Sequence, residues 1–250
     1  MKFTYEAYLD MLMKLSETGY QFSNYKNWKN SEKTVILRHD VDESLRSAVQ
    51  FSEVEKDIDC DATYFILLAT NFYNVHSKSS RECIDTIIKN GGNIGLHFDE
   101  TQYCIQTEEE LMECVYMEAD MLSKVIDMKV DVVSMHRPSE KFLKSDIEFT
   151  DIINSYDKVY FNGMKYLSDS RRRWRENVDE IIEQGSYQRL HILTHPFWYR
   201  AGMEWDMKQT LKTAILNSSL EYYDNLNDNF RDLAGEIERK NIERIICRCD

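Results

Sequence analysis

Positive charge is scarce in this sequence. Its 250 residues contain 31 Lys and Arg against 44 Asp and Glu, which gives a formal net charge of −13. Nucleic-acid phosphates are bound by cationic faces, so this balance argues against a nucleic-acid partner. The same balance argues against simple attachment to an anionic membrane surface.

Long apolar runs are also missing. No stretch approaches the ~18 uninterrupted apolar residues of a membrane-spanning helix. The first 20 residues carry Glu6 and Asp10 where a signal peptide would have an apolar core. We therefore expect no membrane insertion and a cytoplasmic location. The six cysteines are scattered along the chain, which favours reduced thiols over a disulfide framework.

Apolar residues make up 42% of the chain, and their spacing alternates between helical and extended periods. We expect helices at 4–18, 44–57, from Ser79 or Ser80 to Gly91, from Thr107 to about 127, 146–155, 173–184 and beyond 205, and strands at 34–39, 62–69, 93–97, 130–136, 158–161 and 189–195. Such alternation predicts parallel βα units, arranged as a barrel or as an open doubly wound sheet.

Ionisable side chains gather at the ends of these expected strands. They are Asp40 and Asp42, His97 and Asp99, His136 and Arg137, and finally His195. The only two prolines, Pro138 and Pro196, directly follow two of these groups and would stop the strands there. The carboxyl ends of parallel strands form the active-site face of α/β folds, so we expect these side chains to share one site.

This set of residue types suits metal-assisted hydrolysis of an amide or ester. Two carboxylates two residues apart are costly to ionise together unless a cation lies between them. One Asp with two His is a common ligand set for zinc or iron. A further Asp can take a proton from water, a late His can protonate the leaving group, and an Arg can hold the base carboxylate ionised.

Four stretches in this order resemble the polysaccharide deacetylases of the NodB-homology type, carbohydrate esterase family 4. They are "LRHDVD", "IGLHFD", "HRPS" and "LTHPFWY". The resemblance implies an α/β fold, a distorted (β/α)7 barrel, in a single domain spanning 1–250. The barrel would occupy about 30–200, with an N-terminal helical extension and a C-terminal helical tail packed on it.

The resemblance also implies roles for individual residues. Asp40 matches the catalytic base, Arg137 the arginine that orients that base, and His195 the catalytic acid. Asp42 and His97 match metal ligands. Asp169 and Trp174 fall where the family's fourth motif supplies pocket residues. Independently of the resemblance, we expect Trp198 to bind substrate, since sugar rings stack on aromatic faces.

One ligand of the resembled family is replaced here. The family's second motif carries another His four residues after the first, and Thr101 stands at that position. The third metal ligand is therefore open between His136, Asp99 and no protein ligand, and we favour His136. Adjacent strand residues point to opposite sides, which argues against His136 and Arg137 serving one site. We expect His39 to point away from Asp40 and to be structural.

The sequence thus predicts a metal-dependent hydrolase that removes an N-acetyl or similar acyl group from an amino sugar. The divalent metal would be Zn²⁺, with Fe, Ni or Co as alternatives. The partner would be an amino-sugar-containing small molecule or a cytosolic glycan precursor, and a homo-oligomer is compatible with the acidic helical tail. The alternative is a non-catalytic carbohydrate-binding protein with a degenerate metal site.

Overall fold

The computed structural model describes residues 1–145, 147–230 and 233–247. The chain divides into two compact units, 1–202 and 203–250. The first unit carries every candidate site residue, and its boundary lies close to the predicted end of the barrel. The predicted packing of the C-terminal tail on the barrel stays a prediction.

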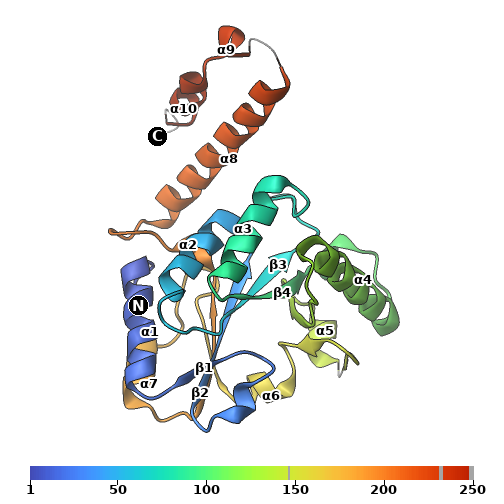
Figure 1. Cartoon of the computed structure of the whole chain (residues 1–250), viewed down its shortest axis with the longest axis vertical. Helices are drawn as coiled ribbons and strands as arrows, with labels where there is room; N and C mark the ends of the chain where they lie inside the picture. The colour runs from blue at the N-terminus through green and yellow to red at the C-terminus, as the bar shows by residue number, and fades with distance from the viewer. Residues whose placement is uncertain (146, 231–232, 248–250) are drawn as a thin grey trace. The chain divides into compact units, whose positions relative to one another are not determined.

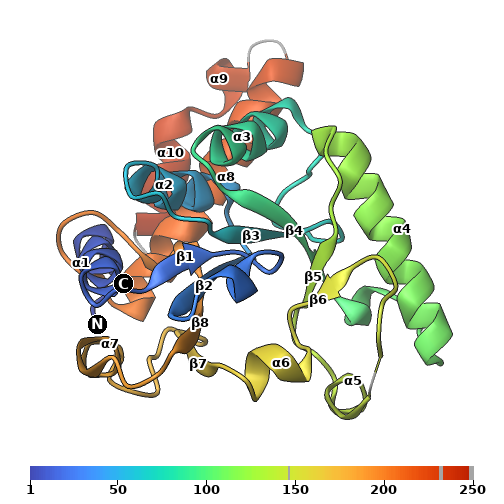
Figure 2. The ribbon, with the colours of Figure 1, turned by 60° about the horizontal axis from the view of Figure 1, so that its bottom comes forward.

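A single curled sheet organises the first unit (Figures 1 and 2). Its strands are β1 (Gln21–Ser23), β2 (Thr34–Val41), β3 (Thr63–Leu67), β4 (Asn93–Phe98), β5 (Val132–Met135), β6 (Ile153–Asn154), β7 (Lys165–Ser168) and β8 (Arg189–Thr194). The order along the sheet is β6-β5-β4-β3-β2-β8-β7, β1 pairs with β2, and each of these pairings is parallel. This confirms the predicted distorted (β/α) barrel, which is open between β6 and β7.

The described part of this unit also contains helices and short helical turns. They are α1 (Tyr5–Glu17), α2 (Leu45–Glu55), α3 (Lys78–Lys89), α4 (Glu108–Ile126), α5 (Glu140–Lys144), α6 (Lys158–Phe161) and α7 (Val178–Gln184), with short 3-10 turns η1 (Trp28–Asn30), η2 (Glu100–Gln102) and η3 (Pro196–Trp198). Figure 2 shows α1 to α4 in an arc around the strands, and α6 between β6 and β7. Thr107 and Glu110 form the predicted capping box at the start of α4.

Strand β2 runs through the middle of this arrangement, and all eight of its residues are buried. Residues alternate between the two faces of a strand, so β2 contributes to two cores. Val35 and Leu37 belong to the large core between sheet and helices. Ile36 belongs to a smaller core inside the curl, which also contains Phe65 and Tyr160. The charged end of β2 must therefore emerge from a strand buried on both faces.

The sequence-based prediction is wrong between residues 146 and 161. The expected helix at 146–155 contains instead strand β6, and the expected strand at 158–161 is the helix α6. Strands β1 and β7 were not predicted. All four elements are only two to four residues long, and so short a window holds too little periodicity to separate a strand from a helix.

The second unit is helical, as predicted. It contains α8 (Met207–Asn229), α9 (Leu233–Glu236) and α10 (Arg239–Cys247). Arg239 at the start of α10 forms a two-pronged ion pair with Asp224 of α8, with nitrogen–oxygen distances of 2.9 and 3.2 Å. Within the described ranges, no helix combines the length and the apolar character needed to cross a membrane.

Candidate metal centre

Three side chains from three strand ends converge at the carboxyl edge of the sheet. Asp42 follows β2, His97 lies in β4, and His136 directly follows β5. Asp42 Oδ1 lies 3.1 Å from His97 Nε2 and 3.3 Å from His136 Nδ1, and the two ring nitrogens are 3.2 Å apart. The three side chains form a group able to hold a metal ion.

These distances fit a cation bound by all three residues. Ligand atoms held at about 2.0–2.1 Å by a tetrahedral ion lie roughly 3.3–3.4 Å apart, close to the spacing seen here. Asp42 Oδ1 is buried and makes no hydrogen bond, even though the two imidazoles lie beside it. Burial would raise the pKa of Asp42, but the His136 and His97 imidazoles hold it well below its usual range. The group is therefore ionised and suited to a divalent cation.

The chain reaches this geometry at His136 by a turn immediately after it. The backbone N–H of His136 donates to the carbonyl of Phe98 at 2.7 Å, so the chain stays beside β4 up to this residue. Arg137 then adopts a φ of 51°, in the left-handed region that a non-glycine residue seldom occupies. His136 consequently faces the site while Arg137 leaves it, which removes the conflict expected from strand alternation.

Arg137 does not make the contact expected of it. Its Nη2 donates to Asp99 Oδ2 at 3.0 Å, and its side chain is 68% exposed. Asp99 also accepts from the backbone N–H and the hydroxyl of Thr101. Asp99 and Thr101 thus pair with each other at the start of η2, apart from the metal-binding group. The expectation that Arg137 orients Asp40 is corrected by this pairing.

The residue that holds Asp40 is Arg38, which the sequence reasoning missed. Arg38 Nε donates to Asp40 Oδ1 at 2.8 Å, and Arg38 Nη2 donates to Asp40 Oδ2 at 2.7 Å. The signal that could have found it is the spacing of two, which puts both side chains on one face of a strand. Burial would raise the pKa of Asp40, but the Arg38 charge and then His97 lower it. Asp40 Oδ2 lies 3.6 Å from His97 Nε2, so an ionised carboxylate stands beside the metal-binding group.

His195 completes the site from the end of β8. Its Nδ1 lies 2.6 Å from Asp169 Oδ1, and its Nε2 lies 3.9 Å from Asp42 Oδ2. Burial lowers the pKa of His195, but Asp169, with smaller contributions from Asp40 and Asp42, raises it to about 9. The imidazole is therefore protonated at neutral pH, and its Nε2 faces the carboxylates.

Asp169 differs from the expectation that it binds substrate. Its side chain is fully buried, and its Oδ2 accepts from the backbone N–H of His195 at 3.0 Å and from the hydroxyl of Tyr199 at 3.1 Å. A carboxylate enclosed by these partners cannot reach a substrate, and it positions His195 instead. Trp174 and Trp198 are half-buried and pack against the larger core, and their substrate role stays a prediction.

His39 faces the opposite side of β2, as predicted. Its Nδ1 lies 2.7 Å from the Thr194 hydroxyl and its Nε2 lies 2.8 Å from Glu55 Oε1. Tyr64 donates a further hydrogen bond to Glu55 at 2.6 Å. Both ring nitrogens are thus paired within the core between sheet and helices.

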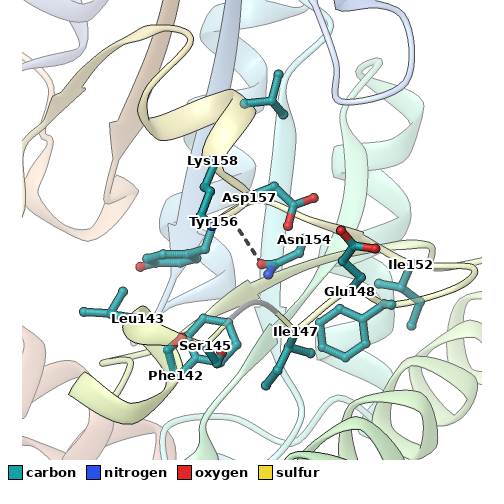
Figure 3. A pocket seen from close by; sticks show the side chains of 12 residues that line it. Phe142, Leu143, Ser145, Ile147, Glu148, Ile152, Asn154, Tyr156, Asp157 and Lys158 are labelled. Carbon is teal, nitrogen blue, oxygen red and sulfur yellow. Dashed lines mark hydrogen bonds between the residues drawn. The ribbon is translucent and has the colours of Figure 1, made fainter.

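A separate hollow of about 660 Å³ lies beside the end of β6 (Figure 3). Its lining residues are Phe142, Leu143, Ser145, Ile147, Glu148, Phe149, Ile152, Asn154, Tyr156, Asp157, Lys158 and Val159. None of the metal-binding residues lines it. Tyr156, one of its lining residues, also contacts Arg38 with its ring.

Comparison with known proteins finds fold relatives alone. No protein-family model matches the sequence, and no curated protein matches it significantly. The chain is similar to the structure of a CE4 family pseudoenzyme from Bacillus anthracis, with 14% identity and a TM-score of 0.42 over 75% of this chain and 60% of that one. It is also similar to the structure of a mutant CE4 family pseudoenzyme with restored enzymatic activity, with 17% identity and a TM-score of 0.43 over 75% of this chain and 62% of that one.

A third similar structure is the Streptococcus pyogenes deacetylase PplD in complex with acetate, at 13% identity and a TM-score of 0.44, covering 77% of this chain and 81% of that chain. The three are named as CE4 proteins or as a deacetylase. This chain spans only about three fifths of the first two chains. At these identities and TM-scores the likeness carries no argument about activity, which rests on the residues of this chain.

Proposed function

We propose that this chain is a metal-dependent hydrolase that removes an N-acetyl or similar acyl group from an amino sugar. The observation that carries the proposal is the convergence of Asp42, His97 and His136 beside two further pairs, Arg38 with Asp40 and Asp169 with His195. These observations support a proposal in which one strand-end face holds a cation, a base and an acid.

Asp42, His97 and His136 would hold the metal. One carboxylate oxygen and two imidazole nitrogens suit Zn²⁺ best, while Fe, Ni and Co accept the same donors. A divalent cation bound there supplies Lewis-acid polarisation of the acyl carbonyl and lowers the pKa of water. Three protein ligands leave room for water and substrate, as a catalytic site requires.

Asp40 and His195 would carry the protons. Asp40 is ionised and held by two hydrogen bonds, so it can accept a proton from the attacking water. His195 is protonated at neutral pH, because its pKa is about 9, and can donate to the departing amine. Asp169 fixes the Nδ1 side of the imidazole, which leaves Nε2 as the donating atom.

The proposed substrate is an amino-sugar-containing small molecule or glycan precursor in the cytoplasm. Sugar rings stack on aromatic faces, and Trp198 lies in η3, directly after His195. Cys60, Cys104 and Cys114 are free thiols, which supports a reducing compartment for this proposal.

The test is release of acetate from N-acetylated amino sugars by the zinc-loaded protein. Asp40→Asn should retain stoichiometric zinc and lose about 10²–10⁴-fold in turnover, the usual contribution of a general base. Asp10→Asn, the same substitution at an exposed position of α1, is the matched control and should behave as the wild type. Near-normal turnover in Asp40→Asn would place the base elsewhere.

A non-catalytic carbohydrate-binding protein is the second candidate. It is favoured by Thr101, which stands where the resembled motif supplies a His and which pairs with Asp99 instead. Sugar binding without acetate release in any metal-loaded form would select this candidate. Release of phosphate rather than acetate would indicate hydrolysis of a phosphoester.

A further inference from the structure

We propose that Arg38 is the residue that positions the base Asp40, in the place of the arginine expected at Arg137. The inference rests on the proposed function, in which Asp40 takes a proton from water. The positioning residue then lies in β2 itself, two residues before Asp40.

The hydrogen bonds of the Arg38 side chain all go to one partner. Nε and Nη2 bind the two oxygens of Asp40, while the buried Nη1 makes no hydrogen bond. Arg38 is completely buried. A guanidinium has five donors and fits a carboxylate in a fixed two-pronged geometry, so this pair fixes the plane of the Asp40 carboxylate.

Aromatic rings hold the guanidinium from the other sides. The Arg38 Cζ atom lies 5.5 Å from the centre of the Phe65 ring and 5.0 Å from that of Tyr156. Cation–π contacts of this kind offset part of the cost of burying the charge. These contacts fix the guanidinium of Arg38, and its two hydrogen bonds in turn fix the orientation of the Asp40 carboxylate.

Buried ion pairs are weak contributors to net stability, because desolvation consumes much of the attraction. Two buried charges at the end of a core strand are thus better explained by the orientation they impose than by stability. Asp40 Oδ2 accepts from Arg38 Nη2 at 2.7 Å and lies 3.6 Å from His97 Nε2, so an oxygen that the arginine holds is the one nearest the metal-binding group. The arginine thereby points the carboxylate at the metal-binding group.

Arg137 is unsuited to this role in the structure. Its guanidinium is largely exposed and is paired with Asp99 after the left-handed turn at Arg137. His136, just before that turn, is kept beside β4 by its backbone hydrogen bond to Phe98 and reaches the metal-binding group. The "HRPS" segment therefore supplies the candidate metal ligand His136, while β2 supplies the arginine that holds the base.

The kinetic test compares Arg38→Met, Arg38→Lys and Arg137→Met, alone and in the Asp40→Asn background. Arg38→Met should lower kcat about as far as Asp40→Asn does, roughly 10²-fold or more, with KM and zinc stoichiometry retained. Arg38→Lys should recover part of kcat, because it restores the charge without the two-pronged geometry. Arg137→Met should change kcat by far less than Arg38→Met.

The double variant separates positioning from other roles. Residues that act as one unit are not additive, so Arg38→Met should cost less than about 3-fold when Asp40 is already Asn. A full additional loss in the double variant, or a larger kcat loss from Arg137→Met than from Arg38→Met, would overturn the proposal. If Arg38→Met fails to fold, Arg38→Lys and the double variant, which removes both buried charges, still decide it.

A structural readout keeps this proposal distinct from the proposed function. Crystal structures of Arg38→Lys and of the wild type, both loaded with zinc, should show Asp40 turned away from its wild-type orientation in the variant while the zinc ligands stay in place. An unchanged Asp40 side chain would overturn the positioning role. This comparison holds even if the wild type releases no acetate, a result that would instead contradict the proposed function.

Discussion

Strand β2 carries buried histidine–carboxylate clusters on its two faces, and they differ in how their atoms are paired. On the outer face, His39 shares its two nitrogens between Thr194 and Glu55, so each polar atom of the ring has its own partner. On the inner face, Asp42 Oδ1, His97 and His136 point at one place, and the oxygen makes no hydrogen bond. We call them the outer cluster (His39, Glu55, Thr194, Tyr8 and Tyr64) and the inner cluster (Asp40, Asp42, His97 and His136).

In a buried strand, a structural polar cluster differs from a binding site in how its polar atoms are arranged. Buried polar atoms are normally paired, and a complete set of pairs rigidifies the fold. In the inner cluster, one carboxylate oxygen and two ring nitrogens converge on one point at 3.1–3.3 Å from one another, a spacing that fits a cation held between them. Both clusters contain histidine and carboxylate side chains, so these residue types alone do not distinguish them, and the convergence of the ligand atoms does.

The largest expected effect is loss of metal binding from the inner cluster. Asp42→Ala and His97→Ala should each abolish stoichiometric zinc binding, because two remaining ligands do not make a tight site. Metal content of the purified variants, with and without added zinc, is the measurement. His39→Ala is the matched control on the other face and should keep its zinc. Full retention of zinc in both inner variants would contradict the proposal that the inner cluster binds the metal.

A large effect on stability is expected from the outer cluster. His39→Ala leaves the buried Glu55 carboxylate and the Thr194 hydroxyl without their ring partners. We expect a loss of about 2–5 kcal/mol in the free energy of unfolding, measured by urea denaturation of the metal-free protein. A loss below about 0.5 kcal/mol would mean that this cluster does not stabilise the fold.

Asp169→Asn should weaken the proton donor and leave the metal site intact. Asp169 is the main group that raises the pKa of His195, so the substitution lowers that pKa from about 9. In the wild type, this interaction contributes stability that is complete below the ordinary His pKa of about 6.5 and is lost as the pH rises through about 9. Below about pH 6.5, the variant should be less stable than the wild type. Its kcat should also begin to fall at a lower alkaline pH than that of the wild type. An unchanged alkaline limb would remove His195 from the acid role.

The smallest effect is expected at a buried carboxylate with one hydrogen-bonded oxygen and one oxygen without a hydrogen bond. Glu118 of α4 accepts a hydrogen bond from the Tyr103 hydroxyl on Oε1, while its buried Oε2 makes none. Burial raises the pKa of Glu118 to about 7. Because the folded protein holds this proton more tightly than the unfolded chain, stability falls as the pH rises from about 4.5 to about 7.

Glu118→Gln should remove that pH dependence. We expect the variant to exceed the wild type by on the order of 1 kcal/mol at pH 8 and to differ little at pH 4. Thermal unfolding at both pH values is the measurement. A variant that is less stable than the wild type at pH 8 would show that the ionised carboxylate is well solvated or paired.

The sequence predicts most of the fold because the long elements are strongly periodic. The capping box at Thr107 and the apolar run that forms β2 are examples. It fails around β6 and α6, where elements of two and four residues carry no usable period. It also leaves open whether the C-terminal helices pack on the barrel, since amphipathic periodicity does not name the surface that a helix covers.

At the site, the motifs place Asp42, His97 and His195 at strand ends, where the structure brings them together. The partners of those residues were harder to predict. Arg137 leaves the site because of a left-handed backbone conformation that no residue type announces. Arg38 could have been found from its spacing to Asp40 on one strand face. The burial of Asp169 depends on tertiary contacts with His195 and Tyr199, which sequence order does not reveal.

The proposed function depends on Asp42, His97 and His136 binding one metal ion. A crystal structure of the zinc-loaded protein, with anomalous scattering measured at the zinc edge, tests it most directly. We predict one peak about 2.0–2.2 Å from Asp42 Oδ1, His97 Nε2 and His136 Nδ1. A zinc bound elsewhere, or a His136 imidazole well beyond about 2.1 Å from the ion, would contradict the assignment.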